Sequence, residues 1–306
     1  MEGIAVFFRA VVFVALTFTS TFAWSADNGT YRFGVVPQFE QRKLFSIWRP
    51  ILDELEHRTG LTFMLVGSPK IPVFEQEYMG GAYDFAYMNP YHLLKAHDSQ
   101  GYLPLVRDGD HVLKGILVVG KESPIQSVQA LAGKRVAFPS PNALGASLLL
   151  RAELTNLHGV EVVPEYVQTH SSVYLHVALG LTEAGGGVDT TLLAQKPEIR
   201  QKLRILYETR PMVPHPICVH PRVPAAHRKK VLQALLEMGQ TDKGAALLAK
   251  IPMYNPVAAS LEDYTPMSAW GLGAFYVSPD QRKSGKSKGS RGKHPIGYDK
   301  SPVAGQ

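Results

Sequence analysis

The chain has 306 residues, of which 45% are hydrophobic and 19% charged, a composition that supports folded domains and excludes a largely disordered protein. Residues 278–306 hold seven Lys or Arg and two Asp, so they carry most of the formal charge of +6 and the remainder is near neutral. A body without a basic stripe argues against nucleic-acid binding, and a single cysteine excludes an internal disulfide.

The first 25 residues have the composition of a secretory signal peptide. Arg9 precedes the apolar stretch VVFVALTFTSTFAW, and Ala23-Trp24-Ser25 places small residues where signal peptidase reads them. We therefore expect cleavage near Ser25 or Ala26 and a periplasmic protein, with an uncleaved membrane anchor as the alternative. No cysteine follows the apolar stretch, so a lipid anchor is not expected.

The other end of the chain has a different composition. Residues 278–306 are rich in Gly, Ser and Lys and contain few apolar side chains. This composition predicts a disordered basic tail, which is either a solvated extension or a functional polybasic arm.

Between these ends, strands and helices alternate, which is typical of α/β layers. In the first series, apolar side chains recur at helical spacing in KLFSIWRPILDELEHRT, and Gly60 ends that helix. The expected strands are 31–37, 61–67, 83–89, 103–109 and 115–120, and the expected helices are 43–59, 71–80 and 90–97.

A second α/β series follows and then a return to the first. The Pro-punctuated stretch PHPICVHPRVP (214–224) is expected to be extended and to cross back to the first lobe. The expected strands are 134–140, 162–168, 184–193 and 203–209, and the expected helices are 127–132, 143–158, 171–180, 225–239 and 242–250.

This order predicts two lobes joined by two crossing strands, with a ligand cleft between them. Lobe 1 is expected to comprise residues 30–115 and 220–277, and lobe 2 residues 116–219. Ligands of open α/β sheets bind outside the carboxyl ends of the strands. The candidate contacts at the ends of the first and third strands are Gln38, Phe39, Tyr87, Asn89 and Tyr91, although aromatic side chains there could equally pack in the core.

The stretch VAFPSPNALGAS joins an expected strand directly to an expected helix. Asn142 to Ser147 open that helix, where free backbone N–H groups favour an anion. The alternative is an ordinary strand-to-helix connection in which Asn142 is the N-cap.

Several stretches, in this order, resemble the PhnD-like family of periplasmic solute-binding proteins for phosphonate, phosphite and phosphate. They span residues 31–275 and comprise YRFGVVP, W-x-P at 48–50, YDFAYMNP, LAGKRVAFPSPN, THSSV and LRILYETRPMVPHPICVHPRVP. The resemblance implies a two-lobed type II periplasmic binding protein that delivers its ligand to an ABC importer.

The resemblance also implies positions for the ligand contacts. Ala143, Leu144 and Gly145 occupy the family's hydroxyl positions, with Ser147 further along, so backbone N–H groups remain but side-chain donors are lost. His170 matches an oxyanion-facing histidine, beside Ser171 and Ser172, and Met88 falls where the family often has Tyr. In aminophosphonate-binding members of the family, two acidic positions contact the amino group of the ligand. They fall here at His215 and in the run with Gly186 and Gly187 and do not match cleanly, so an aminoalkylphosphonate is not expected. The run AGGG would let backbone approach the ligand closely.

Other chemistries are weakly supported. His215 and His220 lie in a Pro-rich stretch with few carboxylates, so we expect no metal site. The sequence lacks G-x-S-x-G, H-E-x-x-H and a P-loop, so neither a cofactor nor an enzyme is expected. We expect a monomer that binds a small anionic or polar ligand and docks on an ABC permease. An input protein for a membrane sensor kinase or cyclase, and an enzyme on this fold, stay open as alternatives.

Overall fold

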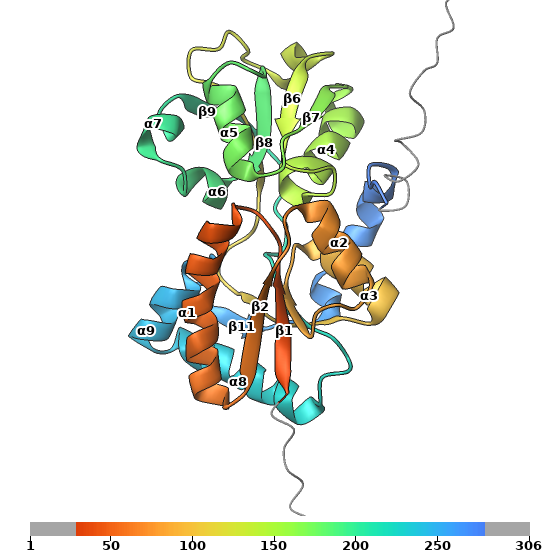
Figure 1. Ribbon diagram of the computed structural model, residues 1–306. Coiled ribbons are helices and arrows are strands. Elements are labelled where there is room, and N and C mark those ends of the chain that lie inside the picture. Colours follow the sequence, from red (N-terminus) through yellow and green to blue (C-terminus); the bar gives the residue numbers. More distant parts are fainter. Residues whose placement is uncertain (1–28, 279–306) are drawn as a thin grey trace, which may run out of the picture.

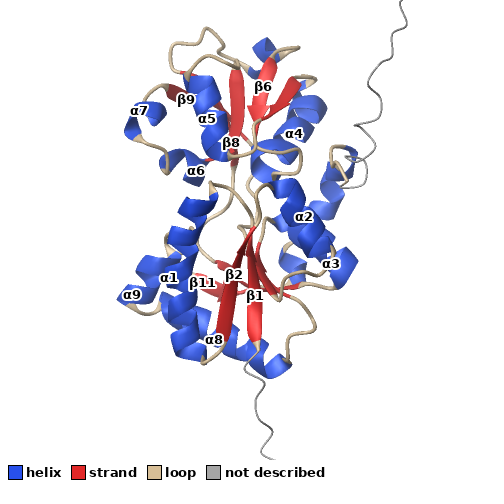
Figure 2. Ribbon diagram, in the orientation of Figure 1, coloured by secondary structure: helices blue, strands red, loops and turns tan. Residues whose placement is uncertain are grey.

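The computed structural model describes residues 29–278, which fold into two α/β lobes (Figure 1). Each lobe has one mixed sheet with helices on both sides (Figure 2), so the expected two-lobed α/β fold is confirmed. Residues 1–25 and the tail beyond Ser278 lie outside the described part of the chain. Within residues 29–278, no helix combines the length and apolar character that crossing a bilayer requires.

The first lobe is built on a six-stranded sheet. Its strands are β1 (Thr30–Val35), β2 (Thr62–Gly67), β3 (Phe85–Tyr87), β4 (Leu103–Asp108), β10 (Ile217–Val219) and β11 (Pro256–Ala258). They lie in the order β11-β4-β10-β3-β1-β2, with β1 parallel to both β2 and β3 and β10 antiparallel to β3 and β4. The parallel strands end at the edge that faces the second lobe (Figure 1).

Helices flank this sheet because each buries an apolar face against it. In the first helix, Leu44, Trp48, Ile51 and Leu55 lie at helical spacing and are buried. The helix ends at Gly60, which adopts φ 66° and donates its N–H to the Glu56 carbonyl at 2.8 Å. The helices of this lobe are α1 (Gln41–Thr59), α2 (Ile71–Met79), α3 (Pro90–Gln100), α8 (Ala225–Gly239) and α9 (Asp242–Leu248).

The second lobe has a five-stranded sheet in the order β7-β6-β8-β5-β9. Its strands are β5 (Gly115–Gly120), β6 (Arg135–Phe138), β7 (Val163–Tyr166), β8 (Ala184–Val188) and β9 (Leu203–Glu208). Its helical segments are the 3₁₀ turn η1 (Val128–Leu131), the π turn η2 (Leu144–Leu148), α4 (Leu149–His158), α5 (His170–Ala178), α6 (Asp189–Leu193) and α7 (Pro197–Arg200). β8 lies parallel to β6 and antiparallel to β5, so the glycine run sits inside the sheet.

Two crossings connect the lobes, as expected from the sequence. They run from β4 to β5 and from β9 to β10, and they are joined by an isolated antiparallel bridge between Leu113 and Met212. Each of these two residues donates its N–H to the carbonyl of the other at 2.8 Å. The crossings therefore form a two-stranded hinge.

One strand lies in a different lobe from the expected one. Ile217–Val219 was expected in lobe 2, but as β10 it pairs with β3 and β4 in the first sheet. Because prolines flank this three-residue strand, its sequence predicts an extended connection between the lobes. Only the long-range pairing of the strand places it in the first lobe. The second crossing is thus confined to residues 209–216.

The Gly-rich region contains less strand than expected. The strand expected over 184–193 ends at Val188, and Asp189 opens α6 with an acidic side chain in its first turn. The sequence also gave no indication of α7 or β11, which are only four and three residues long. By contrast, α8 spans the expected residues.

The segment after β11 connects back to the second lobe. It passes through the 3₁₀ turns η3 (Leu261–Asp263), η4 (Thr265–Trp270) and η5 (Leu272–Ala274) and reaches α4 (Figure 1). There Arg151 Nη2 donates to the Phe275 carbonyl at 2.9 Å, and the Asn142 side chain bonds to the Val277 backbone. This C-terminal segment is a third link between the lobes.

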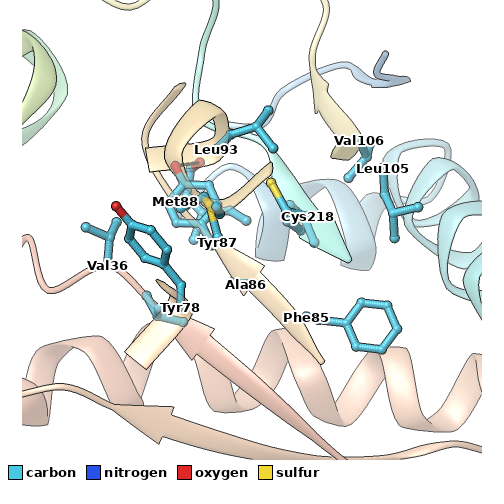
Figure 3. Packing of buried hydrophobic residues seen from close by; sticks show 14 of the residues in the cluster. Val36, Tyr78, Phe85, Ala86, Tyr87, Met88, Leu93, Leu105, Val106 and Cys218 are labelled. Carbon is cyan, nitrogen blue, oxygen red and sulfur yellow. Dashed lines mark hydrogen bonds between the residues drawn. The ribbon is translucent and has the colours of Figure 1, made fainter. Parts of the chain in front are cut away.

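The first lobe's core surrounds β3 (Figure 3). Phe85, Ala86 and Met88 are fully buried, and Cys218 of β10 lies beside Ala86 in the sheet register. Burial raises the pKa of the Cys218 thiol well above its ordinary value. This packing fixes β3, and with it the loop that reaches the cleft.

Candidate functional site

A small cavity of about 20 Å³ lies where the two lobes meet. Residues of both lobes line it, so its size depends on how far the lobes are closed. Among the expected ligand contacts, the cavity brings together Gln38, Asn89, Ala143, Leu144, Gly145, His170 and His215. Its remaining lining residues are Val36, Ile71, Ala146 and Val188.

Backbone N–H groups at the start of the helix formed by η2 and α4 supply one wall. The first hydrogen bonds inside η2 both end on the Ala143 carbonyl, at 2.8 and 3.0 Å. Within residues 29–278, the N–H groups of Leu144, Gly145 and Ala146 have no hydrogen-bond acceptor. A helix start leaves such groups unpaired, and its dipole favours a negative charge there. This wall can therefore hold an anion without a cationic side chain.

His170 forms a second wall and is held by a buried hydrogen-bond network. Its Nδ1 lies 3.1 Å from Thr191 Oγ1, which in turn lies 2.8 Å from the Val188 carbonyl and 2.8 Å from the Tyr174 hydroxyl. The backbone N–H of His170 donates to the backbone carbonyl of Gln38, in the other lobe, at 3.3 Å. Burial lowers the pKa of His170 to about 4.

The network gives the neutral imidazole a defined role. The single hydroxyl proton of Thr191 can go to the Val188 carbonyl at 2.8 Å or to His170 Nδ1 at 3.1 Å, and Tyr174 also donates to that carbonyl at 2.9 Å. When Thr191 donates to Nδ1, the ring proton resides on Nε2, which has no partner within the described residues, and His170 is then an uncharged donor toward the cavity.

His215 enters the cavity from the second crossing. Its ring stacks on Tyr87, with ring centroids 5.3 Å apart and planes at 24°. Burial, together with the smaller effects of the nearby His92 and His170, lowers the pKa of His215 to about 3. The cavity lining contains no Lys, Arg, Asp or Glu, so both histidines and the N–H groups act there as neutral polar partners.

Asn142 faces away from this cavity and links three segments. Its Nδ2 donates to Glu75 Oε1 of α2 and to the Val277 carbonyl, each at 2.8 Å, and its Oδ1 accepts the Val277 N–H at 3.0 Å. Asn89 adds a long 3.4 Å bond to the Asn142 carbonyl. The side chain is fully buried, so in this conformation it joins the lobes rather than contacting the cavity.

The serine hydroxyls also have other partners. Ser147 is buried and accepts the Arg151 Nε–H at 3.2 Å. Ser172 lies 2.9 Å from the N-cap hydroxyl of α5, and Ser171 accepts a 3.4 Å bond from the Gln195 amide. None of these serines lines the small cavity.

Gly186 and Gly187 make room for the protein's own chain. A Cβ on Gly186 would lie 2.0 Å from the Ala146 carbonyl oxygen, and one on Gly187 would lie 1.9 Å from the Tyr174 hydroxyl. Neither glycine lines the cavity. The run lets η2 and α5 approach β8 closely, whereas the sequence suggested close approach of a ligand.

The remaining candidates lie outside the small cavity. Met88 is buried in the core, and Tyr91 packs against Tyr276 with ring centroids 5.6 Å apart. Phe39 lies under Lys43, whose Nζ is 3.9 Å from the ring centroid. Phe39 and Tyr87 line wider parts of the cleft.

Sequence reasoning missed Thr191 and Glu75, which orient His170 and Asn142. Thr191 was placed in the strand expected over 184–193, where its hydroxyl has no assignable partner. The order Val-Asp-Thr-Thr after the glycine run was a signal for a helix start, because an acidic residue favours the first turn of a helix.

A sequence model of the family described as "ABC transporter, phosphonate, periplasmic substrate-binding protein" matches residues 33–264. The chain belongs to this family. A curated relative, the phosphonates-binding periplasmic protein of Escherichia coli strain K12, is 21% identical over 268 aligned residues, and the match covers 79% of each chain. The family consists of substrate-binding components of transporters, so the expectation of a periplasmic binding protein rather than an enzyme is confirmed.

Solved structures have the same fold. The binding protein component of a Pseudomonas aeruginosa ABC phosphonate transporter superposes with a TM-score of 0.74 at 16% identity, covering 85% of this chain and 93% of that one. PhnD1 from Prochlorococcus marinus, solved with methylphosphonate, superposes with a TM-score of 0.73 at 15% identity, covering 82% of this chain and all of that one. Both similarities show that the chain has the two-lobed fold of these proteins.

Proposed function

We propose that this protein captures a small oxyanion of the phosphonate, phosphite or phosphate class by hinge closure and delivers it to an ABC permease. The observation that carries the proposal is the group of free N–H donors on Leu144, Gly145 and Ala146, which meet His170 and His215 in one cavity. An oxyanion offers acceptors in several directions, so it can accept all of these hydrogen bonds at once.

The size of the cavity supports capture by movement of the lobes. A cavity of about 20 Å³ accommodates roughly one water-sized sphere, which is less than a phosphonate group. The ligand therefore enters when the lobes separate at the hinge bridged by Leu113 and Met212. Closure on the ligand then gives the permease a surface formed by both lobes.

The absence of acidic side chains from the cavity lining bears on the choice of ligand. An alkylammonium group would need a carboxylate, whereas this lining offers neutral histidines, amides and N–H groups. We therefore propose an oxyanion without an amino group. We also propose that the protein reaches the periplasm through the signal peptide of residues 1–25 and acts as a monomer.

Calorimetric titration tests this function with phosphate, phosphite, sulfate, methylphosphonate and 2-aminoethylphosphonate. At least one oxyanion is expected to bind and to raise the melting temperature. The substitution His170→Ala should weaken that binding about tenfold or more, because one donor to a charged group is lost. The matched control is His176→Ala, on the same helix and paired with Glu165 at 3.7 Å, which should leave affinity unchanged. Equal affinity of wild type and His170→Ala for every oxyanion would overturn the proposed site.

A further inference from the structure

The small cavity continues into a wider side groove between the lobes. Two further cavities, of about 500 and 210 Å³, share a set of lining residues, which we call the side groove: Gln38, Tyr87, Thr190, Leu193, Pro252 and Tyr254. Gln38 also lines the small cavity, and His215 lines both the small cavity and the one of about 500 Å³. The cleft is thus polar and narrow at one end and wide at the other.

The walls of the side groove are aromatic and aliphatic. In the cavity of about 210 Å³, the first lobe adds Phe39 and Trp48 to Tyr87 and Tyr254, and the second lobe contributes Leu193. Leu193 is 64% exposed, the largest value among the exposed large hydrophobic side chains of the described residues, and Tyr254 is 50% exposed. Apolar side chains left open at a cleft mouth indicate a ligand surface.

The charged groups around the groove argue against a cationic ligand. Glu208 is paired with Lys114 at 3.0 Å, and Asp110 accepts the Asn255 amide at 2.7 Å. Asp189 accepts the N–H of its neighbour Thr190 at 2.7 Å at the start of α6. These carboxylates already have partners, so an added ammonium group would have to compete for them.

We propose that the natural ligand is a phosphonate with an aromatic substituent, whose ring lies in the side groove while its oxyanion lies in the small cavity. This inference rests on the proposed oxyanion function and adds the substrate class. The substituent leaves the small cavity between Gln38 and His215 and passes over Tyr87. Its ring then contacts the aromatic side chains of the first lobe, and closure covers it with Leu193.

Titration of the purified protein with benzylphosphonate and methylphosphonate tests the groove separately from the oxyanion site. Both ligands present the same head, so the ratio of their dissociation constants isolates the ring. Benzylphosphonate is expected to bind about tenfold tighter or more, because burial of a ring removes apolar surface from water. The substitution Leu193→Asn should reduce that ratio by roughly threefold or more, since it removes the apolar cover.

Leu157→Asn is the matched control. Leu157 is 58% exposed on α4 and lines none of these cavities, so its substitution should leave the ratio unchanged. Equal affinities of the wild type for both ligands, or an unchanged ratio in Leu193→Asn, would overturn the groove while leaving the oxyanion function in place. If neither phosphonate nor any other oxyanion binds, both the groove and the oxyanion function are overturned.

Discussion

The contact between β8 and the turn η2 can be tested with a single methyl group. In Gly186→Ala, the new Cβ would lie 2.0 Å from the Ala146 carbonyl oxygen, whereas ordinary contacts between heavy atoms are about 3.5 Å. β8 is held by β5 and β6 on its two sides, so the turn η2 has to move, by more than about 1 Å. Such overpacking costs about 1–3 kcal/mol of folding free energy.

The same displacement should cost ligand affinity. The N–H groups of Leu144, Gly145 and Ala146 move with the turn, and loss of one hydrogen bond to a charged ligand costs about 1.5–3 kcal/mol. We expect methylphosphonate, or whichever oxyanion the wild type binds, to bind roughly ten- to a hundredfold more weakly by calorimetry. Urea unfolding monitored in parallel separates this loss from unfolding.

Gly120→Ala provides the matched control in the same sheet. The nearest atom to a Cβ at Gly120 is Ser123 Cβ at 3.9 Å, so the substitution should change neither stability nor affinity appreciably. Wild-type affinity in a folded Gly186→Ala protein would refute the prediction that β8 positions η2 for ligand binding.

Three further outcomes are expected. Thr191→Val should weaken oxyanion binding about tenfold, because His170 Nδ1 loses its hydroxyl partner, and should lower the free energy of unfolding by about 1–3 kcal/mol, because Tyr174 and Val188 also lose a buried partner. Calorimetry alongside melting curves checks this, and unchanged affinity would refute it. Asn142→Ala should lower the free energy of unfolding by about 3 kcal/mol, because it removes the hydrogen bonds to Glu75 and to the C-terminal segment. The urea midpoint measures this loss, and a loss of free energy smaller than one ordinary surface hydrogen bond contributes would contradict the prediction. Burial lowers the pKa of His170 to about 4 and that of His215 to about 3, so below pH 6.5 the unfolded chain binds more protons than the folded one. The free energy of unfolding should therefore fall between pH 6.5 and 4, by about 3 kcal/mol from His170 alone. A urea midpoint that does not change with pH in this range, or a pH dependence that His170→Gln leaves unaltered, would count against the buried neutral state.

Local sequence signals predicted most of the fold because they act within single elements. The helix Ala225–Gly239 and the Gly60 terminus of α1 could be assigned from apolar spacing and a glycine stop. The strand Ile217–Val219 could not be placed, because its lobe depends on pairing with strands more than a hundred residues earlier in the chain.

The candidate site was predictable only to the level of its backbone. The strand-to-helix order at 136–147 predicted a helix start with free backbone N–H groups, and the cavity includes it. The direction of the Asn142 side chain was not predictable, because its partners Glu75 and Val277 are 67 and 135 residues away in sequence. The glycine run was assigned to the ligand because sequence alone does not reveal which atom a missing side chain makes room for.

The burial of Cys218 makes the protein suitable for site-specific labelling. It is the chain's single cysteine, it is 0% exposed, and its raised pKa keeps the thiol protonated and unreactive toward maleimides. Cysteines introduced at Leu157 and Phe45, which are exposed on opposite lobes, would therefore accept a donor and an acceptor dye without background labelling. Energy transfer between the dyes would then follow hinge motion directly, in single molecules and in real time.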